Sequence, residues 1–328
     1  MIVPQVTVDL GSLAADDDQL VQQLKHWGFL GSVLLTVDGS ANESLQKVIY
    51  QTIKKVSGFC DLLIQFEQAD NEAAIEMLNV GGSQLVVGSA SQMEAWPSVP
   101  RERIELVSDI EHLKPVSELE QQPEIITQFF VSRLRSDRPD GFWPTVICDP
   151  LGVALGLAYS NEQSLAHAIA TRQGTYWSRS RDELWIMGAS SGATQQLLGI
   201  RTDCDSDCLR FTVTQGPPGF CHKKTYTCFG EERSIATVLQ RLAERIESSN
   251  EKSFTRRLAT DAKLLEKKLL EEAQELSEAS QLDDRYEVAW ETADVFYFSL
   301  VAMLKKGVGL EEVYAELARR MNRVVRRD

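Results

Sequence analysis

The sequence Asp203-Cys-Asp-Ser-Asp207, followed by Cys221-His222 and then by Cys228, gathers cysteines, carboxylates and a histidine into one short segment. Thiolates at such spacing are typical of a zinc site, around which the neighbouring chain must fold. Three protein ligands leave zinc one open position for a water molecule, whereas a fourth would make the site structural. We therefore predict a catalytic zinc site held by Cys204, Cys221 and Cys228.

Other interpretations of this segment stay open. Cys208 follows Cys204 closely enough to act as a fourth, structural zinc ligand. The aspartates Asp203, Asp205 and Asp207 alternate as calcium ligands do in an EF-hand loop, but Cys208 stands where that loop requires glycine. We predict a separate magnesium site on the three aspartates. The alternative is a solvated acidic turn beside core cysteines.

The sequence before the cysteines completes a recognisable pattern. It contains Thr175-Tyr-Trp-Ser-Arg-Ser-Arg181, Glu183-Leu-Trp185, Gly188 and Ser190-Ser-Gly192. From about residue 130 to residue 230, this pattern resembles the phosphoribosyl-AMP cyclohydrolases of histidine biosynthesis. The resemblance implies a zinc-dependent opening of the adenine ring. It also implies a homodimer in which Cys204 of one subunit joins Cys221 and Cys228 of the other.

Candidate substrate ligands lie in the same region. Arg179 and Arg181 alternate with serines in a strand predicted from Tyr176 to Trp185, so both guanidinium groups would lie on one face and suit a phosphate. The further substrate-binding candidates are Trp177, Ser191 and Gly192, although Trp177 also fits a core position. His222, next to a zinc ligand, is the candidate for proton transfer, and its alternative role is that of a hydrogen-bonded structural histidine.

The region from residue 1 to about residue 115 alternates short apolar runs with amphipathic segments. Strands are expected at Val3–Leu10, Gly31–Val37, Asp61–Phe66, Gln84–Val87 and Arg103–Val107, with helices at Asp16–Trp27, Glu43–Ser57, Asn71–Asn79 and Ser91–Trp96. Strict alternation predicts a parallel α/β sheet, which resembles half of a βα barrel. We assign no chemistry to this domain. Gly88-Ser89 could bind phosphate through backbone amides, but a simple glycine turn is the favoured interpretation. The polar stretch Pro115–Pro123 reads as a linker.

After Gly230 the periodicity becomes helical. Leu265, Leu269, Glu272 and Leu276 form one stripe, so a carboxylate occupies a core position, where it needs a cation or another partner. The segment Val288–Leu304 is apolar nearly all round and is expected to be buried. Its two acids share one face. We predict a magnesium site formed by Glu271, Glu272, Glu275, Glu291 and Asp294, with Glu272 and Glu275 as catalytic residues. An ordinary charged helix face is the alternative for Glu271, Glu275 and Glu278.

The spacing of these acids, with Ser253-Phe-Thr-Arg-Arg-Leu before them and Asp294-Val-Phe-Tyr-Phe at their end, resembles phosphoribosyl-ATP pyrophosphohydrolase. The two resemblances correspond to consecutive steps of histidine biosynthesis, as in the front part of the fungal multifunctional proteins. We therefore expect a bifunctional, nucleotide-binding hydrolase that uses zinc and magnesium. The alternative is a structural module whose dimer is held together by zinc, joined to a general nucleoside triphosphate pyrophosphohydrolase.

Composition limits the other possibilities. The 328 residues carry 34 basic and 48 acidic side chains, a formal net charge of −14, which disfavours a nucleic-acid partner. The sequence shows no signal-peptide pattern and no long apolar run, so we expect a cytoplasmic protein without a membrane partner. The predicted domains are an α/β domain (1–115), a central, mostly β, α+β domain (128–230) and an all-α bundle (235–328).

Overall fold

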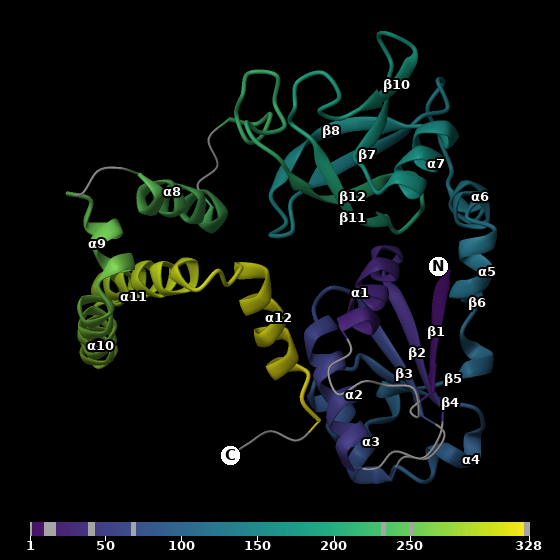
Figure 1. Ribbon diagram of the computed structural model, residues 1–328, viewed down its shortest axis with the longest axis horizontal. Helices are drawn as coiled ribbons and strands as arrows, with labels where there is room; N and C mark the ends of the chain where they lie inside the picture. The colour runs from purple at the N-terminus through teal and green to yellow at the C-terminus, as the bar shows by residue number, and fades with distance from the viewer. Residues whose placement is uncertain are drawn as a thin grey trace. The chain divides into compact units, whose positions relative to one another are not determined.

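The computed structural model describes residues 2–9, 18–38, 43–66, 70–230, 234–248 and 252–324 (Figure 1). By their contacts the residues divide into two compact units. Unit 1 contains residues 1–231 and 314–328, and unit 2 contains residues 232–313. No helix within the described ranges is long and apolar enough to cross a membrane.

The first part of unit 1 is a six-stranded parallel sheet in the order β5-β4-β3-β2-β1-β6. Its strands are β1 (Val3–Asp9), β2 (Ser32–Asp38), β3 (Asp61–Phe66), β4 (Gln84–Val87), β5 (Ile104–Leu106) and β6 (Leu113–Pro115). Between them come α1 (Asp18–Trp27), η2 (Gly28–Leu30), α2 (Glu43–Val56), α3 (Asn71–Asn79), α4 (Ala90–Met93), η3 (Arg101–Arg103) and η4 (Val107–Asp109). Val33, Leu34 and Leu35 of β2 are all fully buried, as expected for a parallel strand covered on both faces.

This sheet confirms the predicted half-barrel α/β class. The predicted residues Leu10, Asp16 and Asp17 lie outside the described ranges. The linker prediction was wrong, because residues 116–121 form helix α5 (Val116–Gln121), whose Leu119 is fully buried. Helix α6 (Glu124–Arg133) follows immediately.

The second part of unit 1 is mainly sheet, as predicted. Strands β7 (Trp143–Cys148), β8 (Ala154–Ser160), β11 (Gln195–Thr202) and β12 (Leu209–Gln215) pair in the order β11-β12-β7-β8. Helix α7 (Glu162–Thr171) begins with a capping box between Asn161 and Ser164. Strands β9 (Thr175–Ser178) and β10 (Glu183–Ile186) form a separate antiparallel pair.

One hydrophobic core extends through both parts of unit 1. Phe29 and Leu30 of η2 belong to the same buried cluster as Ile200 of β11 and Phe130 of α6. Arg201 on β11 also donates from Nη1 to the carbonyl oxygen of Phe29 at 3.4 Å. The predicted domain of residues 1–115 therefore shares its core with the region that follows it.

Unit 2 is helical, which agrees with the predicted all-α class. Its helices are α8 (Ile235–Glu247), α9 (Phe254–Thr260), α10 (Ala262–Ala279), α11 (Arg285–Lys305) and the beginning of α12 (Leu310–Met321). Asp261 and Asp284 begin α10 and α11, because each side chain accepts hydrogen bonds from two backbone amides of the first turn. The expectation that α11 is buried was wrong for part of its surface. Trp290 and Phe296 are exposed in the single chain.

The end of α12 packs within unit 1. Arg319 donates from Nη1 to the carbonyl oxygen of Asn79 at 2.9 Å, and the amide of Val324 donates to Oδ1 of Asn79 at 2.9 Å. Gly58 has a positive φ of 89°, and a β-carbon there would collide with Ala315. The close approach of this helix thus requires a glycine at the turn after α2.

Candidate metal centres

Three carboxylates from α10 and α11 meet in the helical unit. Ligand oxygens of Glu272, Glu275 and Glu291 all lie within 4.8 Å of one another. Glu272 and Glu291 are only 6% and 8% exposed. The helices pack side by side, so acids from two separate stretches of sequence converge.

This acid cluster brings several negative charges close together. Desolvation raises the pKa of Glu291, and the charges of Glu275, Glu287, Asp294 and Glu272 raise it further. Oε2 of Glu291 is buried and has no hydrogen-bond partner among the described residues. Buried carboxylate oxygens without a partner are costly, and a hard divalent cation would compensate them. The donor set therefore fits magnesium.

The positively charged side chain of Lys268 lies beside the acid cluster. Lys268 donates to Oε1 of Glu272 at 3.1 Å and pairs with Oε2 of Glu271 at 3.2 Å. Sequence reasoning missed Lys268, although its position four residues before Glu272 is the usual spacing of a helical ion pair. Of the five predicted ligands, Glu271 and Asp294 do not belong to the group that meets within 4.8 Å. Asp294 is half-buried and near enough to raise the pKa of Glu291.

Cys221 and Cys228 lie together on the loop that follows β12. A hydrogen bond from the backbone of Lys223 is the largest cause that lowers the pKa of Cys221, and the nearby side chains of Thr225 and Cys228 lower it further. Desolvation, together with Cys221, raises the pKa of Cys228. His222 is exposed, and its Nδ1 lies 3.9 Å from the sulfur of Cys221. A thiol with a lowered pKa next to a second thiol is a suitable start for a zinc site.

Cys204 does not complete that site within one chain. Among the described residues, no group of three potential metal ligands includes any of the three predicted cysteines. Cys204 is exposed, and its sulfur lies 3.9 Å from Oδ1 of Asp205. Cys208 is half-buried, and its thiol donates to the carbonyl oxygen of Leu209 at 3.6 Å. Desolvation is the first cause of its raised pKa, which disfavours a thiolate.

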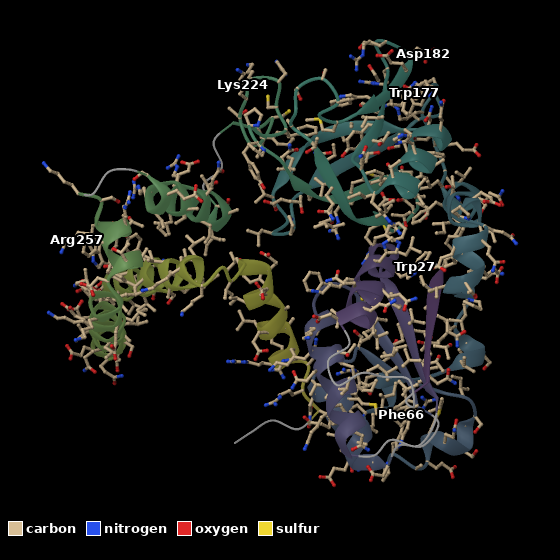
Figure 2. The ribbon with its side chains drawn as sticks, in the orientation of Figure 1. Trp27, Phe66, Trp177, Asp182, Lys224 and Arg257 are labelled. Atoms are coloured by element: carbon tan, nitrogen blue, oxygen red, sulfur yellow. The ribbon has the colours of Figure 1, made fainter. Side chains whose placement is uncertain are left out.

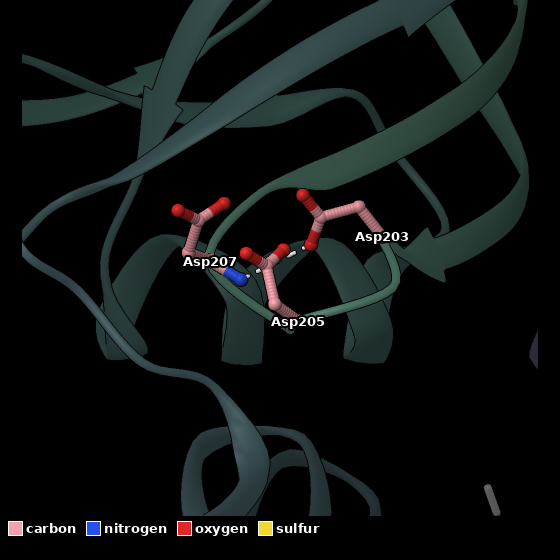
Figure 3. A group of neighbouring side chains, drawn as sticks. All are labelled: Asp203, Asp205 and Asp207. Carbon is pink, nitrogen blue, oxygen red and sulfur yellow. Dashed lines mark hydrogen bonds between the residues drawn. The ribbon is translucent and has the colours of Figure 1, made fainter.

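The three aspartates between β11 and β12 form the second acid cluster (Figure 3). Their oxygens come within 4.8 Å of one another at an exposed turn. Oδ1 of Asp203 accepts from the amides of Asp207 at 3.0 Å and Cys208 at 3.1 Å. Desolvation, the largest single contribution, would raise the pKa of Asp203. The hydrogen bonds outweigh it, so the pKa is lowered. The charge of Asp205 is the first cause of the raised pKa of Asp207. The residues suit a hard cation and also suit a self-bonded acidic turn.

The strand predicted across both arginines was wrong. Residues 179–182 form a turn between β9 and β10, with Asp182 at a positive φ of 53°. Arg179 stacks on Tyr159 at 3.6 Å from the ring centre, while Arg181 pairs with Glu183 at 2.9 Å. The two guanidinium groups therefore do not share a strand face. The sequence did not indicate this turn, because residues 179–182 contain neither glycine nor proline.

The other predicted substrate residues lie at two turns. Trp177 is half-buried, and its Nε1 donates to Oδ1 of Asp182 at 3.2 Å near the tip of the hairpin (Figure 2). Ser191 is exposed, and its hydroxyl accepts from the amide of Ala193 at 3.3 Å. Gly192 has a positive φ of 78° and open space around its α-carbon. At Gly88 and Ser89, both amides already donate to Oε1 of Gln92, which supports a simple turn there.

Asp149 fixes the position of the cysteine loop, and sequence reasoning missed it. It is 3% exposed and accepts at Oδ1 from the amides of Leu151 and Val153 at 2.9 and 2.8 Å. Its Oδ2 accepts from the hydroxyl of Tyr226, which lies between the two cysteines in sequence. The Asp-Pro-Leu-Gly turn after β7 was the available signal, because aspartate commonly bonds to such turns.

Two family models match the regions that contain the cysteines and the helical acids. The model "Phosphoribosyl-AMP cyclohydrolase" matches residues 156–230, and the model "Phosphoribosyl-ATP pyrophosphohydrolase" matches residues 236–321.

Three curated relatives match this chain over different shares of its length. The histidine biosynthesis trifunctional protein of Saccharomyces cerevisiae is 35% identical over 94% of this chain and 41% of its own length. The histidine biosynthesis bifunctional protein his7 of Schizosaccharomyces pombe is 34% identical over 87% of this chain and 62% of its own length. The histidine biosynthesis bifunctional protein HisIE of Synechocystis is 41% identical over 55% of this chain and 89% of its own length.

The chain spans less than half the length of the trifunctional relatives it matches. It covers most of the shorter bifunctional relative at an identity that demonstrates common descent. The chain therefore belongs to the family of bifunctional phosphoribosyl-AMP cyclohydrolase and phosphoribosyl-ATP pyrophosphohydrolase proteins of histidine biosynthesis.

Proposed function

We propose that the chain catalyses two consecutive hydrolyses in histidine biosynthesis. In the first, water cleaves phosphoribosyl-ATP to phosphoribosyl-AMP and pyrophosphate. In the second, water adds to C6 of the adenine ring and the bond between C6 and N1 opens. The proposal is supported by the fact that each of the two matched regions has its own group of metal-type side chains.

In the pyrophosphohydrolase region, Glu272, Glu275 and Glu291 would hold magnesium. The bound ion would neutralise phosphate charge and position the triphosphate. Asp294 and Glu271 are proposed as additional ligands at the edge of this cluster. Lys268 holds Glu272 in place, so the carboxylate is oriented before substrate binds. The unpartnered Oε2 of Glu291 is the observation that most favours a metal here.

In the cyclohydrolase region, Cys204, Cys221 and Cys228 would hold zinc, which would supply a Lewis acid for the addition of water to the ring. His222 is proposed to transfer the proton, since it is exposed beside Cys221. The aspartates Asp203, Asp205 and Asp207 would hold magnesium near the substrate phosphate. Residues 1–115 are proposed to take no part in the chemistry.

We further propose that a homodimer completes the zinc site. Cys221 and Cys228 lie together within one chain, whereas Cys204 joins no group of potential metal ligands in the described parts of the chain, which supports a contribution from a second subunit. Mixing Cys204→Ala with Cys221→Ala tests this. Each variant alone would be inactive in ring opening, but a mixed dimer would contain one intact site. Random exchange should restore about a quarter of the parent activity. No restoration, despite confirmed subunit exchange, would contradict the shared site.

The overall assignment is tested by incubating the purified chain with phosphoribosyl-ATP. Pyrophosphate and the ring-opened product are followed separately, with ordinary nucleoside triphosphates as competing substrates. We expect both products, and we expect turnover of phosphoribosyl-ATP to exceed that of ATP. Equal turnover of ATP without ring opening would favour a general nucleotide pyrophosphohydrolase instead.

A further inference from the structure

A cavity of about 700 Å³ lies in unit 1, where α1, α5, α6 and α7 come together. Its walls include the apolar side chains Trp27, Leu119, Ile126 and Ile169. None of the candidate metal ligands or substrate ligands lines it. Its volume lies within the range of small-molecule sites, which are mostly apolar with a few polar groups.

Arg172 supplies the positive charge in this cavity. The residue follows α7 and has a positive φ of 56°, so its side chain leaves the helix at the C-cap. Its guanidinium group stacks over the ring of Phe29 at 3.1 Å from the ring centre. Its Nη2 donates to Nε2 of His26 at 3.4 Å. Neither ring supplies a negative charge to the guanidinium group. Desolvation and the charge of Arg172 lower the pKa of His26, although the charge of Glu120 acts in the opposite direction.

The guanidinium group of Arg172 has no ion-pair partner in the part of the chain that the structure describes. Its Nη1 atom is buried and has no hydrogen-bond partner within the described ranges. Burial lowers the pKa of Arg172 to about 9. The residue as a whole is half-buried, and a cation that is partly desolvated without an anionic partner destabilises the folded state. An anion in the cavity would relieve this cost.

The lining restricts what this anion can be. The apolar walls require an apolar body, and a single unpaired guanidinium suits a single carboxylate, which it can bind through two parallel hydrogen bonds. The exposed acids Glu120, Glu124 and Glu162 line the same cavity and would repel a multiply charged anion. They would tolerate a monoanion and would favour an additional ammonium group.

We propose that this cavity binds a small organic carboxylate with an apolar body, whose carboxylate pairs with Arg172. Such a ligand could be a simple acid or a free amino acid, since both present this chemistry to the guanidinium group. The site would lie between the first sheet and the cyclohydrolase region of unit 1, separate from both metal centres.

The test uses the full chain and two matched series of probes. One series is L-phenylalanine, 3-phenylpropanoate and 2-phenylethylamine, and the other is L-tryptophan, 3-indolepropanoate and tryptamine. Binding is measured by calorimetric titration and by the shift in melting temperature, which ligand binding to the folded state raises. At least one carboxylate should bind, and both amines should fail. If the amino acid binds more tightly than the simple acid, Glu120, Glu124 and Glu162 interact with its ammonium group. If the simple acid binds more tightly, the ligand of this cavity is a simple carboxylic acid. If no carboxylate binds, or if the amines bind equally well, the proposal is overturned.

Variants separate this site from a structural role of Arg172. Arg172→Met should weaken carboxylate binding at least about tenfold, because a buried charge pair is lost. It should leave the melting temperature of the unliganded chain unchanged or higher, since an unpaired buried charge is removed. Arg210→Met, which removes an exposed arginine outside the cavity, should bind the probes like the parent. Ala166→Phe, which fills the cavity while keeping Arg172, should also abolish binding. Retained binding in both Arg172→Met and Ala166→Phe would refute the site.

Discussion

The hydroxyl of Tyr226 donates a hydrogen bond of 2.9 Å to Oδ2 of Asp149, a residue 77 positions earlier in the chain. Tyr226 belongs to the loop that carries Cys221 and Cys228, whereas Asp149 follows the central strand β7. The loop is thereby fixed to the sheet by a charged acceptor that is itself held by two backbone amides. A small displacement of this loop would move both sulfur atoms.

Tyr226→Phe should therefore affect stability and metal binding together. Loss of a half-buried hydrogen bond to a carboxylate should lower the free energy of unfolding by about 1–3 kcal/mol. Zinc affinity should fall as well, because the loop loses its anchor. Denaturant unfolding and zinc titration measure the two effects. Tyr159→Phe is the matched control, since the hydroxyl of Tyr159 makes no hydrogen bond within the described residues. Equal behaviour of the two variants would contradict the anchoring role.

The two proposed chemistries should be separable by single substitutions. Cys221→Ala should reduce ring opening at least about a hundredfold and leave pyrophosphate release within about twofold of the parent. Glu272→Gln should reduce pyrophosphate release and leave ring opening close to the parent rate, because a neutral amide is a weaker ligand for magnesium. Steady-state kinetics of each step, with Glu278→Gln as an exposed control on α10, provide the measurement. A folded variant that loses both reactions would contradict two independent sites.

Cys208→Ser should match the parent in zinc content and in ring-opening rate. The thiol of Cys208 already donates to a backbone carbonyl, and its raised pKa disfavours the thiolate that zinc requires. Metal analysis of the purified variant, together with its kinetics, measures this. Loss of zinc would support a four-cysteine structural site.

Acid should weaken the attachment of the end of α12. A hydrogen bond from Arg319 is the first cause that lowers the pKa of Glu316 to about 2. A carboxyl whose pKa is lower in the folded state contributes stability that is complete above its unfolded pKa, about 4.3, and is lost as the pH falls towards 2. Glu316→Gln should therefore destabilise the chain at neutral pH and flatten this part of the pH dependence. Unfolding followed between pH 7 and about pH 3 measures the effect. Glu72→Gln, at an exposed position on α3, should keep the parent's profile; a parent-like profile for Glu316→Gln would refute the prediction.

The sequence pattern predicted elements best where burial alone determines them. The fully buried run of β2 and the inward position of Glu272 both followed from periodicity. The turn at Arg179 and Arg181 was missed because Asp182 adopts a left-handed conformation without glycine. Helix α5 was mistaken for a linker because its exposed side chains are polar, although Leu119 is buried.

The site was predictable only as far as local spacing determines contacts. Glu272 and Glu275 lie one turn apart on α10, so their proximity follows from helical geometry. The meeting of Glu291 with them depends on how α10 and α11 pack, which no spacing specifies. The separation of Cys204 from Cys221 and Cys228, and the anchoring of their loop by Asp149, likewise arise from tertiary structure.

The contacts of Arg319 and Val324 with Asn79 attach the segment after the helical unit to unit 1. Residues 232–313 are preceded and followed by segments of unit 1, so this unit is topologically an insertion. A single proteolytic cut between Gly230 and α8 would therefore leave both fragments associated through residues 314–324. The chain nicked there would still migrate as one particle under native conditions and separate only in denaturant.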